Sequence, residues 1–430
     1  MRVRPSQLMP VRLPAVLALA LALPAGGTAQ TGEIRVHDPV IMKQGDTYYV
    51  FATGGRIPIL KSHDLKTWER GGRVFAEMPA WVAGTIPGAR GSLWAPDISF
   101  LDGKYHLYYS ASTFGSQLSA IGLATNVTLD STSADYRWED QGVVVQSTPR
   151  VSTFNAIDPN LILAENGEPW LAWGSFWGGI KMRKVDRATG LLSRQDTTLY
   201  SLAARAGTDV TVGANGQQSI EGAFIVRRAT SPRPAPRPDT ARAPAGAPVE
   251  AAAGAPAGVA AGAPAGAAVG AAGAAAGAPA GVAAGAAGAA AGGAGGARRQ
   301  PQQPVPPAYY YLFVSFDRCC AGARSTYNIR VGRSEKVTGP YLDPNGKPMT
   351  EGSGMVVLSS HGRVRGPGHN AILIEGDTYY LVHHFYDAED NFSSRLQIRP
   401  LTWVEDWPYA GDPVTPPPPG TPRAPRPGQD

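Results

Sequence analysis

Cysteine and charge are both scarce in this sequence. Only two cysteines occur among 430 residues, the adjacent pair Cys319 and Cys320. Adjacent cysteines rarely bridge each other without backbone strain, so we expect two small residues in or near a strand and no disulfide. Charged residues make up 17% of the chain, and many of its arginines lie in the terminal and low-complexity segments. The rest has no basic helix or stripe, which disfavours nucleic-acid binding.

Long apolar runs are lacking except near the N-terminus. Residues 1–30 begin with arginines and continue with an apolar stretch at 13–24. That stretch is too short to span a bilayer, and the small residues at 27–29 are typical of a cleavage site. The pattern predicts a signal peptide and a secreted or periplasmic protein with no membrane span. A membrane anchor is the alternative.

Large side chains are absent from a long internal segment. Between residues 251 and 297 only Ala, Gly, Pro and Val occur, and glycine is not at every third position, which excludes a collagen helix. Because there is no sizeable apolar surface to bury, residues 229–307 are predicted to be a disordered insert. Residues 413–430 are rich in proline and are predicted to be a loose tail. The remainder, within 31–412, is enough for one large domain.

Helical periodicity is nearly absent, and a strand-based unit recurs five times instead. Each unit opens with a polar or acidic residue and an apolar run, and continues to an aromatic-rich strand. The openings lie at 37–41, 95–98, 157–161, 220–224 and 368–372, and the aromatic strands at 48–51, 105–109, 170–173, 309–313 and 379–382. Turn residues such as Asp102-Gly103 separate opening from strand in four units. A repeated all-strand unit favours radial closure, which leaves few free sheet edges.

We therefore predict an all-β protein, a five-bladed β-propeller with four antiparallel strands in each blade. The insert at 229–307 falls between the first two strands of the fourth blade, so we expect it to interrupt a hairpin and to point away from the site. The outermost strands of the second and fourth blades are expected near 136–138 and 339–341.

Three of the five openings are expected to place a carboxylate next to the central axis, at Asp38, Asp158 and Glu221. The first strand of each propeller blade lines the central channel, so these side chains should converge at one mouth of it. Clustered carboxylates repel each other, which raises one pKa while another stays low. This difference supplies the proton donor and the base that cleavage of a glycosidic bond requires. A structural or calcium-binding carboxylate cluster is the alternative.

Aromatic and small polar residues near the proposed mouth favour a sugar ligand, because aromatic faces stack on sugar rings and polar groups fix hydroxyls. The candidate substrate-binding residues are Trp94, Phe114, Gly115, Asn155, Ser175 and Phe176, and Trp173 and Trp177 lie nearby. For each aromatic residue, packing in the core is the alternative.

Seven stretches of the chain, in order, resemble glycoside hydrolase family 43, and within it the endo-α-1,5-L-arabinanases. They are residues 37–39, 93–97, 155–160, 173–180, 219–222, 316–320 and 366–370. The Ser-Phe-Trp-Gly-Gly segment at 175–179 and the Asp-Arg-Cys-Cys segment at 317–320 point to arabinanases over the xylosidases of that family. The insert is a departure from the family pattern.

The resemblance implies an inverting hydrolase, expected to be monomeric, that cuts internal bonds of arabinan. Asp38 would be the general base and Glu221 the general acid, while Asp158 would hold the acid and raise its pKa. His369 would help to hold a calcium ion, with water completing the ligand shell. An exo-acting α-L-arabinofuranosidase or β-xylosidase on the same scaffold is one alternative. A non-catalytic carbohydrate-binding propeller is the other.

Overall fold

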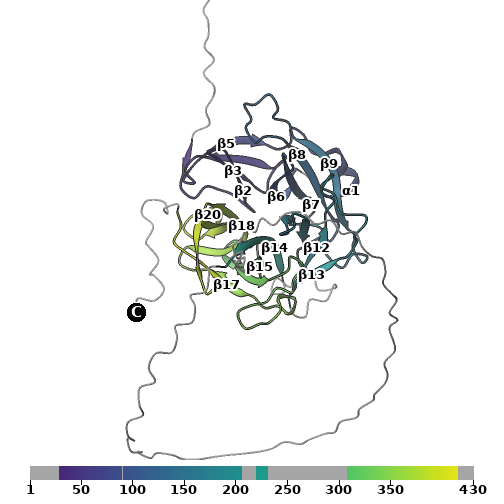
Figure 1. Cartoon of the computed structure of the whole chain (residues 1–430). Coiled ribbons are helices and arrows are strands. Elements are labelled where there is room, and N and C mark those ends of the chain that lie inside the picture. The colour runs from purple at the N-terminus through teal and green to yellow at the C-terminus, as the bar shows by residue number, and fades with distance from the viewer. Residues whose placement is uncertain (1–28, 90, 206–218, 231–307, 415–430) are drawn as a thin grey trace, which may run out of the picture. The chain divides into compact units, whose positions relative to one another are not determined.

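A computed structural model describes residues 29–89, 91–205, 219–230 and 308–414 of the chain (Figure 1). The predictions for the signal peptide, for most of the insert and for most of the tail lie outside these residues. No helix among the described residues has the length and apolar character needed to cross a membrane.

The described chain forms five antiparallel sheets, one for each of the repeated units, which confirms the five-bladed propeller. The sheets follow one another around the ring in chain order, as the colours of Figure 1 show. The first blade contains β2 (Val40–Gln44), β3 (Thr47–Phe51), β4 (Pro58–Ser62) and β5 (Thr67–Arg73), with β1 (Gln30–Thr31) added outside β5. The second blade contains β6 (Trp94–Leu101), β7 (Lys104–Ala111), β8 (Ser119–Asn126) and β9 (Glu139–Ser147).

The other three blades have the same strand order. The third contains β10 (Asn160–Leu163), β11 (Pro169–Trp173), β12 (Ile180–Lys184) and β13 (Tyr200–Ala203). The fourth contains β14 (Ile220–Ala229), β15 (Ala308–Phe316), β16 (Asn328–Ser334) and β17 (Met355–Leu358). The fifth contains β18 (Val364–Glu375), β19 (Thr378–Asp387), β20 (Ser393–Val404) and β21 (Trp407–Ala410). Three short helices lie in loops, α1 (Ala80–Thr85), η1 (Gly322–Arg324) and η2 (Met349–Glu351).

Two of the predicted outer strands were misplaced. The outermost strand of the second blade begins at Glu139, just after residues 136–138, and that of the fourth blade is β17, well beyond residues 339–341. A longer connection that includes η2 joins β16 to β17. Outer strands bury less apolar surface than inner ones, so their hydrophobic pattern in the sequence is weaker.

The predicted hairpin turns are present at one end of the blades. Asp102 and Gly103 form a two-residue loop between β6 and β7, with φ of 50° and 79°. The register of β14 and β15 pairs Ala229 with Ala308, so the insert joins these strands at the hairpin end. Glu221 lies at the opposite end of β14, where it pairs with Ser315. The insert is therefore attached to the propeller at the end remote from the predicted site.

Apolar residues fill the spaces between neighbouring blades. One cluster joins the second and third blades, with Tyr108, Leu171 and Trp173 at its centre, and comparable clusters join the third blade to the fourth and the fourth to the fifth. Burial of such aromatic and branched side chains is the main favourable contribution to folding, so the blades stabilise one another and fix the central channel.

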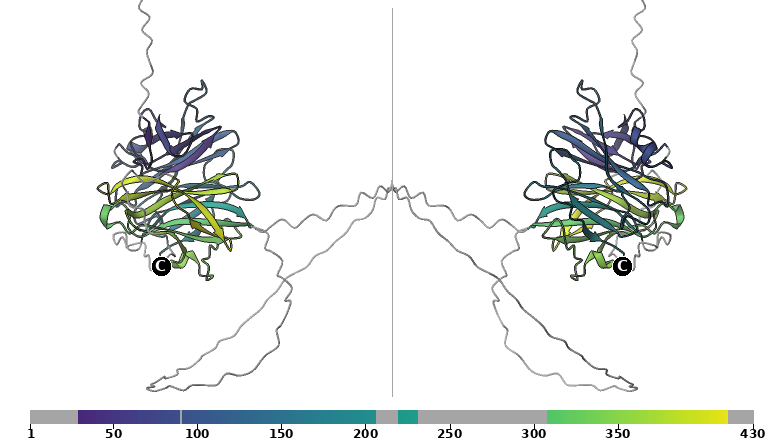
Figure 2. Two further views of the ribbon diagram at one scale, coloured as in Figure 1. Left: turned by 90° about the vertical axis from the view of Figure 1, so that its left-hand side faces the viewer. Right: turned by 90° about the vertical axis from the view of Figure 1, so that its right-hand side faces the viewer.

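The N-terminal segment closes the ring against the last blade, and the purple and yellow blades lie side by side in Figures 1 and 2. Arg35 forms an antiparallel bridge with Arg395, and the Leu396 amide donates to the Ile34 carbonyl at 2.8 Å. Arg363 forms ion pairs with both Glu33 and Asp387, and the three side chains are at most 8% exposed. We call these three residues the closure cluster.

Candidate active site

A left-handed backbone residue stands at the opening of every blade. The positive φ values are 47° at Asp38, 43° at Ala95, 58° at Asp158, 60° at Gly222 and 48° at His369. In the second, fourth and fifth blades the ladder register also shifts at this point. Bulges and left-handed residues redirect side chains out of the regular alternation of a strand. In the first, third, fourth and fifth blades the opening thereby brings a polar side chain, of Asp38, Asp158, Glu221 or His369, to one mouth of the channel.

These side chains line a cavity of about 530 Å³. All ten of the predicted site residues are on its wall: Asp38, Trp94, Phe114, Gly115, Asn155, Asp158, Ser175, Phe176, Glu221 and His369. They come from all five blades and from residues more than three hundred positions apart in the chain. The predicted convergence of the three carboxylates is thus present in the structure.

Asp38 is enclosed by one hydroxyl and three imidazole groups. Its Oδ2 accepts a hydrogen bond from Thr53 Oγ1 at 2.6 Å and lies 2.9 Å from His37 Nδ1. Its Oδ1 lies 3.4 Å from His369 Nδ1. Its backbone amide donates to His384 Nδ1 at 3.1 Å, so that nitrogen is an acceptor and the buried His384 is neutral.

This surrounding keeps Asp38 ionised. Burial alone would raise the pKa of Asp38, but the neighbouring imidazoles, with His37 first among them, outweigh it and hold the pKa well below its ordinary value. Burial opposes the charged form of His37, yet the Asp38 carboxylate raises the pKa of that imidazole. Burial lowers the pKa of His384 well below its ordinary value. The Asp38 carboxylate is therefore available as a base.

The pKa values of Glu221 and Asp158 are shifted upward, in the opposite direction from that of Asp38. Burial raises the pKa of Glu221, although a hydrogen bond from Ser175 Oγ at 2.7 Å lowers it in part. Burial and the nearby Glu221 and Asp38 carboxylates raise the pKa of Asp158 well above its ordinary value. Asp158 Oδ2 accepts the amide of Gly222 at 3.1 Å, which fixes the backbone next to Glu221. The cavity thus holds one ionised carboxylate and two carboxyl groups that favour the protonated form.

The pKa of Glu221 is raised for a different physical reason than the one expected from the sequence. We expected the like charge of Asp158 to raise it, but burial is the main cause and Asp158 itself favours the neutral form. The contact of Asp158 with Glu221 is made through the Gly222 amide.

The predicted sugar-contacting residues differ in exposure. Phe114 is 83% exposed at the rim, whereas Asn155 is buried and its Oδ1 accepts from Ser147 Oγ at 3.4 Å. Phe176 and Trp177 lie on the loop between β11 and β12, which packs closely against the connection from β9 to β10, since a Cβ on Gly178 would meet the Thr153 carbonyl oxygen at 2.0 Å. Trp173 is fully buried between two blades and does not line the cavity, so for this residue the core alternative holds.

The expectation that Cys319 and Cys320 do not bridge each other is wrong. Cys319 and Cys320 form a disulfide, and both line the cavity. The Tyr386 hydroxyl accepts the Cys320 amide at 3.0 Å and lies 3.1 Å from His37 Nε2, which links this loop to the partners of Asp38. His37 and the Cys-Cys pair stood in the matching stretches, so the family resemblance already marked them. Thr53, Tyr386 and His384 carried no local signal and were missed.

The expected calcium site can be tested against the groups around Asp38. His37, Asp38 and His384 each offer a ligand atom within 4.8 Å of the others. Calcium prefers about six to eight oxygen ligands, whereas this cluster offers one carboxylate among imidazole nitrogens, which suit transition metals better. The protein atoms alone therefore do not fit a calcium ion.

Buried carboxyl groups with opposite pKa shifts, in one cavity at the axis of a five-bladed propeller, are the arrangement expected of a glycoside hydrolase. The family model of the glycosyl hydrolases family 43 matches residues 31–229 and 307–408, which leaves out only the insert within the domain. The chain belongs to this family.

Several relatives cover nearly the whole chain. It is 34% identical over 399 residues to an extracellular exo-α-(1→5)-L-arabinofuranosidase of Cellvibrio japonicus, covering 92% of this chain and 91% of that protein. It is 34% identical over 377 residues to an extracellular endo-α-(1→5)-L-arabinanase of Bacillus subtilis, covering 87% of each. The solved structure of a Cellvibrio cellulosa α-L-arabinanase complexed with arabinohexaose is 32% identical, with a TM-score of 0.67, and the match covers 88% of this chain and 96% of that one.

Proposed function

We propose that this protein hydrolyses internal α-1,5-L-arabinofuranosidic bonds of arabinan by a single displacement with inversion. The observation that carries the proposal is that Asp38 and Glu221 line one cavity, where their surroundings shift the pKa of Asp38 downward and that of Glu221 upward. An inverting hydrolase needs one ionised and one protonated carboxyl group at the same pH. The Bacillus subtilis relative, named an endo-arabinanase, supports the substrate and the mode of cleavage.

In the proposed reaction Asp38 takes a proton from a water molecule, whose oxygen attacks the anomeric carbon. Glu221 gives its proton to the glycosidic oxygen as the bond between that oxygen and the anomeric carbon breaks. Asp158 touches neither reacting oxygen and acts as a positioning residue, through its hydrogen bond to the Gly222 amide. His37 and Thr53 hold the Asp38 carboxylate in place.

Inversion requires room for water between the two carboxyl groups, so we expect them to be roughly 6.5–9.5 Å apart. Proton NMR of the first product formed from an α-linked substrate tests this directly. A β-configured reducing end supports single displacement, and an α-configured one contradicts it.

Exo action is a second candidate, because the named exo-acting relative is as similar to this chain as the named endo-acting one. Product analysis on linear, debranched arabinan separates the two modes. Mixed oligosaccharides early in the reaction support endo action, and short products of a single length support exo action. Binding without release of reducing ends would indicate a non-catalytic propeller. The control is Glu221→Gln, which removes the proposed acid but keeps the size of the side chain.

We also propose that the protein is exported and acts as a monomer. Two relatives are named extracellular, and the first thirty residues carry the signal pattern described above. Cell fractionation with immunodetection, and light scattering after size exclusion, test the two statements. Retention in the cytoplasm or a mass of twice 45.0 kDa would contradict them.

A calcium ion bound through His369 is proposed as well, with water supplying most of the ligands, since the protein offers few oxygens there. Calorimetric titration of calcium into chelator-treated protein tests it. We expect binding to the parent protein, loss in His369→Ala, and retention in His63→Ala, which removes an exposed histidine of the first blade. Equal binding in both variants would exclude His369 as a ligand.

A further inference from the structure

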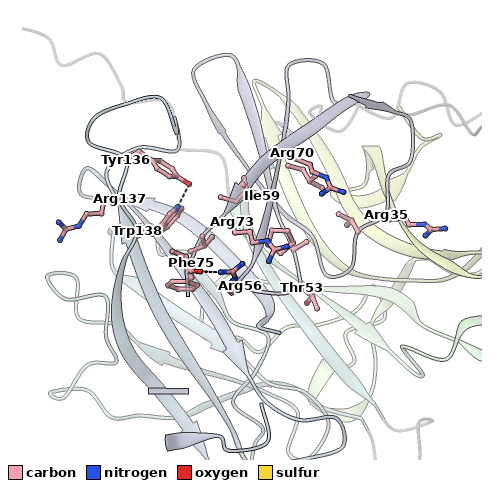
Figure 3. Close-up of a pocket in the computed structure, with 17 residues that line it drawn as sticks. Arg35, Thr53, Arg56, Ile59, Arg70, Arg73, Phe75, Tyr136, Arg137 and Trp138 are labelled. Atoms are coloured by element: carbon pink, nitrogen blue, oxygen red, sulfur yellow. Dashed lines mark hydrogen bonds between the residues drawn. The ribbon is translucent and has the colours of Figure 1, made fainter. Parts of the chain in front are cut away.

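A second cavity, of about 910 Å³, lies against the first blade and the loop before β9 (Figure 3). It is larger than the cavity that holds the three carboxylates. Among the residues that the structure describes, its wall carries neither aspartate nor glutamate but five arginines, Arg35, Arg56, Arg70, Arg73 and Arg137. The wall also carries three aromatic residues, Phe75, Tyr136 and Trp138.

A β-bulge brings two of the arginines to the same face of the sheet. In the ladder between β4 and β5, Leu60 pairs with Arg70 and Ile59 pairs with Gly72, so Gly71 is an extra residue. Arg70 and Arg73 therefore oppose Leu60 and Pro58, which are two positions apart on β4 and share a face. A Cβ on Gly71 would lie 2.9 Å from Lys61 Cγ and 3.0 Å from Ile59 Cγ2, so glycine is required for the bulge.

The arginines are available to an anion to different degrees. Arg70 and Arg73 make no hydrogen bond or ion pair with any residue that the structure describes, and both are exposed. Arg56 donates to the Ala76 carbonyl. Arg35 and Arg137 lie at the two ends of the cavity in Figure 3 and form exposed ion pairs with Asp390 and Glu139, which contribute little stability. Arg56, Arg70 and Arg73 make up the positive centre between these ends.

The aromatic residues lie beside this positive centre. Trp138 Nε1 donates to the Tyr136 hydroxyl at 3.1 Å, which fixes the two rings, and Phe75 lies next to Arg56 in Figure 3. Guanidinium groups bind carboxylates through paired N–H donors, and aromatic faces stack on sugar rings. The cavity is far larger than an inorganic phosphate or sulfate ion requires.

We propose that this cavity, the arginine cavity, is a second carbohydrate-binding site, and that it recognises sugars with carboxylate groups, as in a polyuronate chain. The inference goes beyond the proposed function, because it concerns binding at another site. Thr53 lines both cavities, so the two ligands would lie on either side of the same residue. A protein with a site for acidic sugar beside one for neutral sugar can hold a polysaccharide that contains both.

The test is calorimetric binding of tetragalacturonate to the full chain at low salt. The parent protein is expected to bind it, to bind the fully methyl-esterified form at least about tenfold more weakly, and to lose affinity with added salt. The variant Arg70→Ala/Arg73→Ala is expected to lose at least about tenfold in affinity, the scale of one or two charge-assisted hydrogen bonds. The matched control Arg194→Ala/Lys336→Ala removes two exposed charges from the third and fourth blades and should bind as the parent does.

Equal affinity of the Arg70→Ala/Arg73→Ala variant and the parent, or no binding of tetragalacturonate, would overturn the inference. If inorganic phosphate binds at this cavity as tightly as tetragalacturonate does, the cavity is a general anion site. That result would also overturn the inference. Hydrolysis of a short neutral arabino-oligosaccharide is measured in parallel and should be unchanged in both double variants. If that hydrolysis is absent from every protein, the proposed function fails while the binding result still stands.

Discussion

Two clusters of buried carboxyl groups in this propeller have opposite consequences. In the closure cluster, Arg363 lies between Glu33 and Asp387 and pairs with both, and Gln397 donates to Glu33 at 2.6 Å. In the cavity, Asp38, Asp158 and Glu221 have hydroxyl, amide and imidazole partners, and no arginine or lysine of the described residues pairs with them. A fixed cation keeps buried carboxylates together as a structural element, whereas titratable neighbours leave the protons free to move.

The largest expected effect is on turnover, in Asp38→Asn and Glu221→Gln. Each removes the proposed base or acid, so kcat should fall by about 10²–10⁴-fold, the usual contribution of general acid–base catalysis. Reducing-end assays on arabinan measure it, with thermal unfolding to confirm folding.

The matched control for these variants is Asp97→Asn. Asp97 is also buried at a blade opening, and burial raises its pKa to about 7, but its oxygens accept from Asn160 and the Leu161 amide and do not face the cavity. It should lose stability and keep most of its turnover. Near-normal hydrolysis by Asp38→Asn would show that the carboxyl groups of the cavity, like those of the closure cluster, are not needed for catalysis.

The second largest effect is expected in Arg363→Met, which should lower the free energy of unfolding. Two buried carboxylates would lose their cation, and breaking a buried ion pair on one side costs about 3–5 kcal/mol. Urea unfolding should show this loss, while kcat per folded molecule stays unchanged in the cold. The control is Arg194→Met, at an exposed position of the third blade. Equal stability of the two variants would mean that the closure cluster does not hold the ring.

A pH-dependent effect is expected in Asp158→Asn. The folded state raises the pKa of Asp158 above its ordinary value of 3.8, so ionisation costs the folded protein free energy. The parent protein should lose stability as the pH rises from near 4 toward the raised pKa, by up to about 1.4 kcal/mol per pH unit, and the variant should not. Unfolding free energies measured from pH 4 to 8 test this. Parallel profiles for the two proteins would contradict the protonated state of Asp158.

A smaller shift is expected in Ser175→Ala. The Ser175 hydroxyl stabilises the charged form of Glu221 and lowers its pKa, so its loss should raise that pKa further. The alkaline limb of the kcat profile should then move upward by up to about one pH unit, because one unit corresponds to about 1.4 kcal/mol. Ser201→Ala, which removes a hydroxyl bonded to Lys181 outside the cavity, is the control. A downward movement would exclude Glu221 as the acid.

The smallest effect is expected from deleting residues 235–303. Both ends of this insert meet the propeller at the hairpin end of β14 and β15, remote from Glu221. Turnover on arabinan should stay within about twofold of the parent, since the segment joins the two strands at their hairpin end and a long loop there costs little closure entropy. A large loss of turnover would show that the insert contributes to hydrolysis.

The pattern along the sequence was enough to predict the repeat, and with it the number of blades, the first two strands of each and the convergence of Asp38, Asp158 and Glu221. These features could be predicted because an opening, a Gly-containing turn and an aromatic strand are each encoded within a few neighbouring residues. The family resemblance also marked His37 and the Cys-Cys pair, although the disulfide itself was judged improbable.

Which buried acids face the cavity could not be predicted from the sequence, because it depends on how the blades pack together. Asp97 and Asp158 both follow blade openings, yet one is bonded within the wall and the other faces the cavity. His384 reaches the Asp38 amide and Tyr386 reaches His37 from a strand more than three hundred residues along the chain, and the bulge at Gly71 puts Arg70 and Arg73 on one face of the sheet. A pKa and a binding surface depend on distances between chain segments, and those distances are set only when the blades pack around their axis.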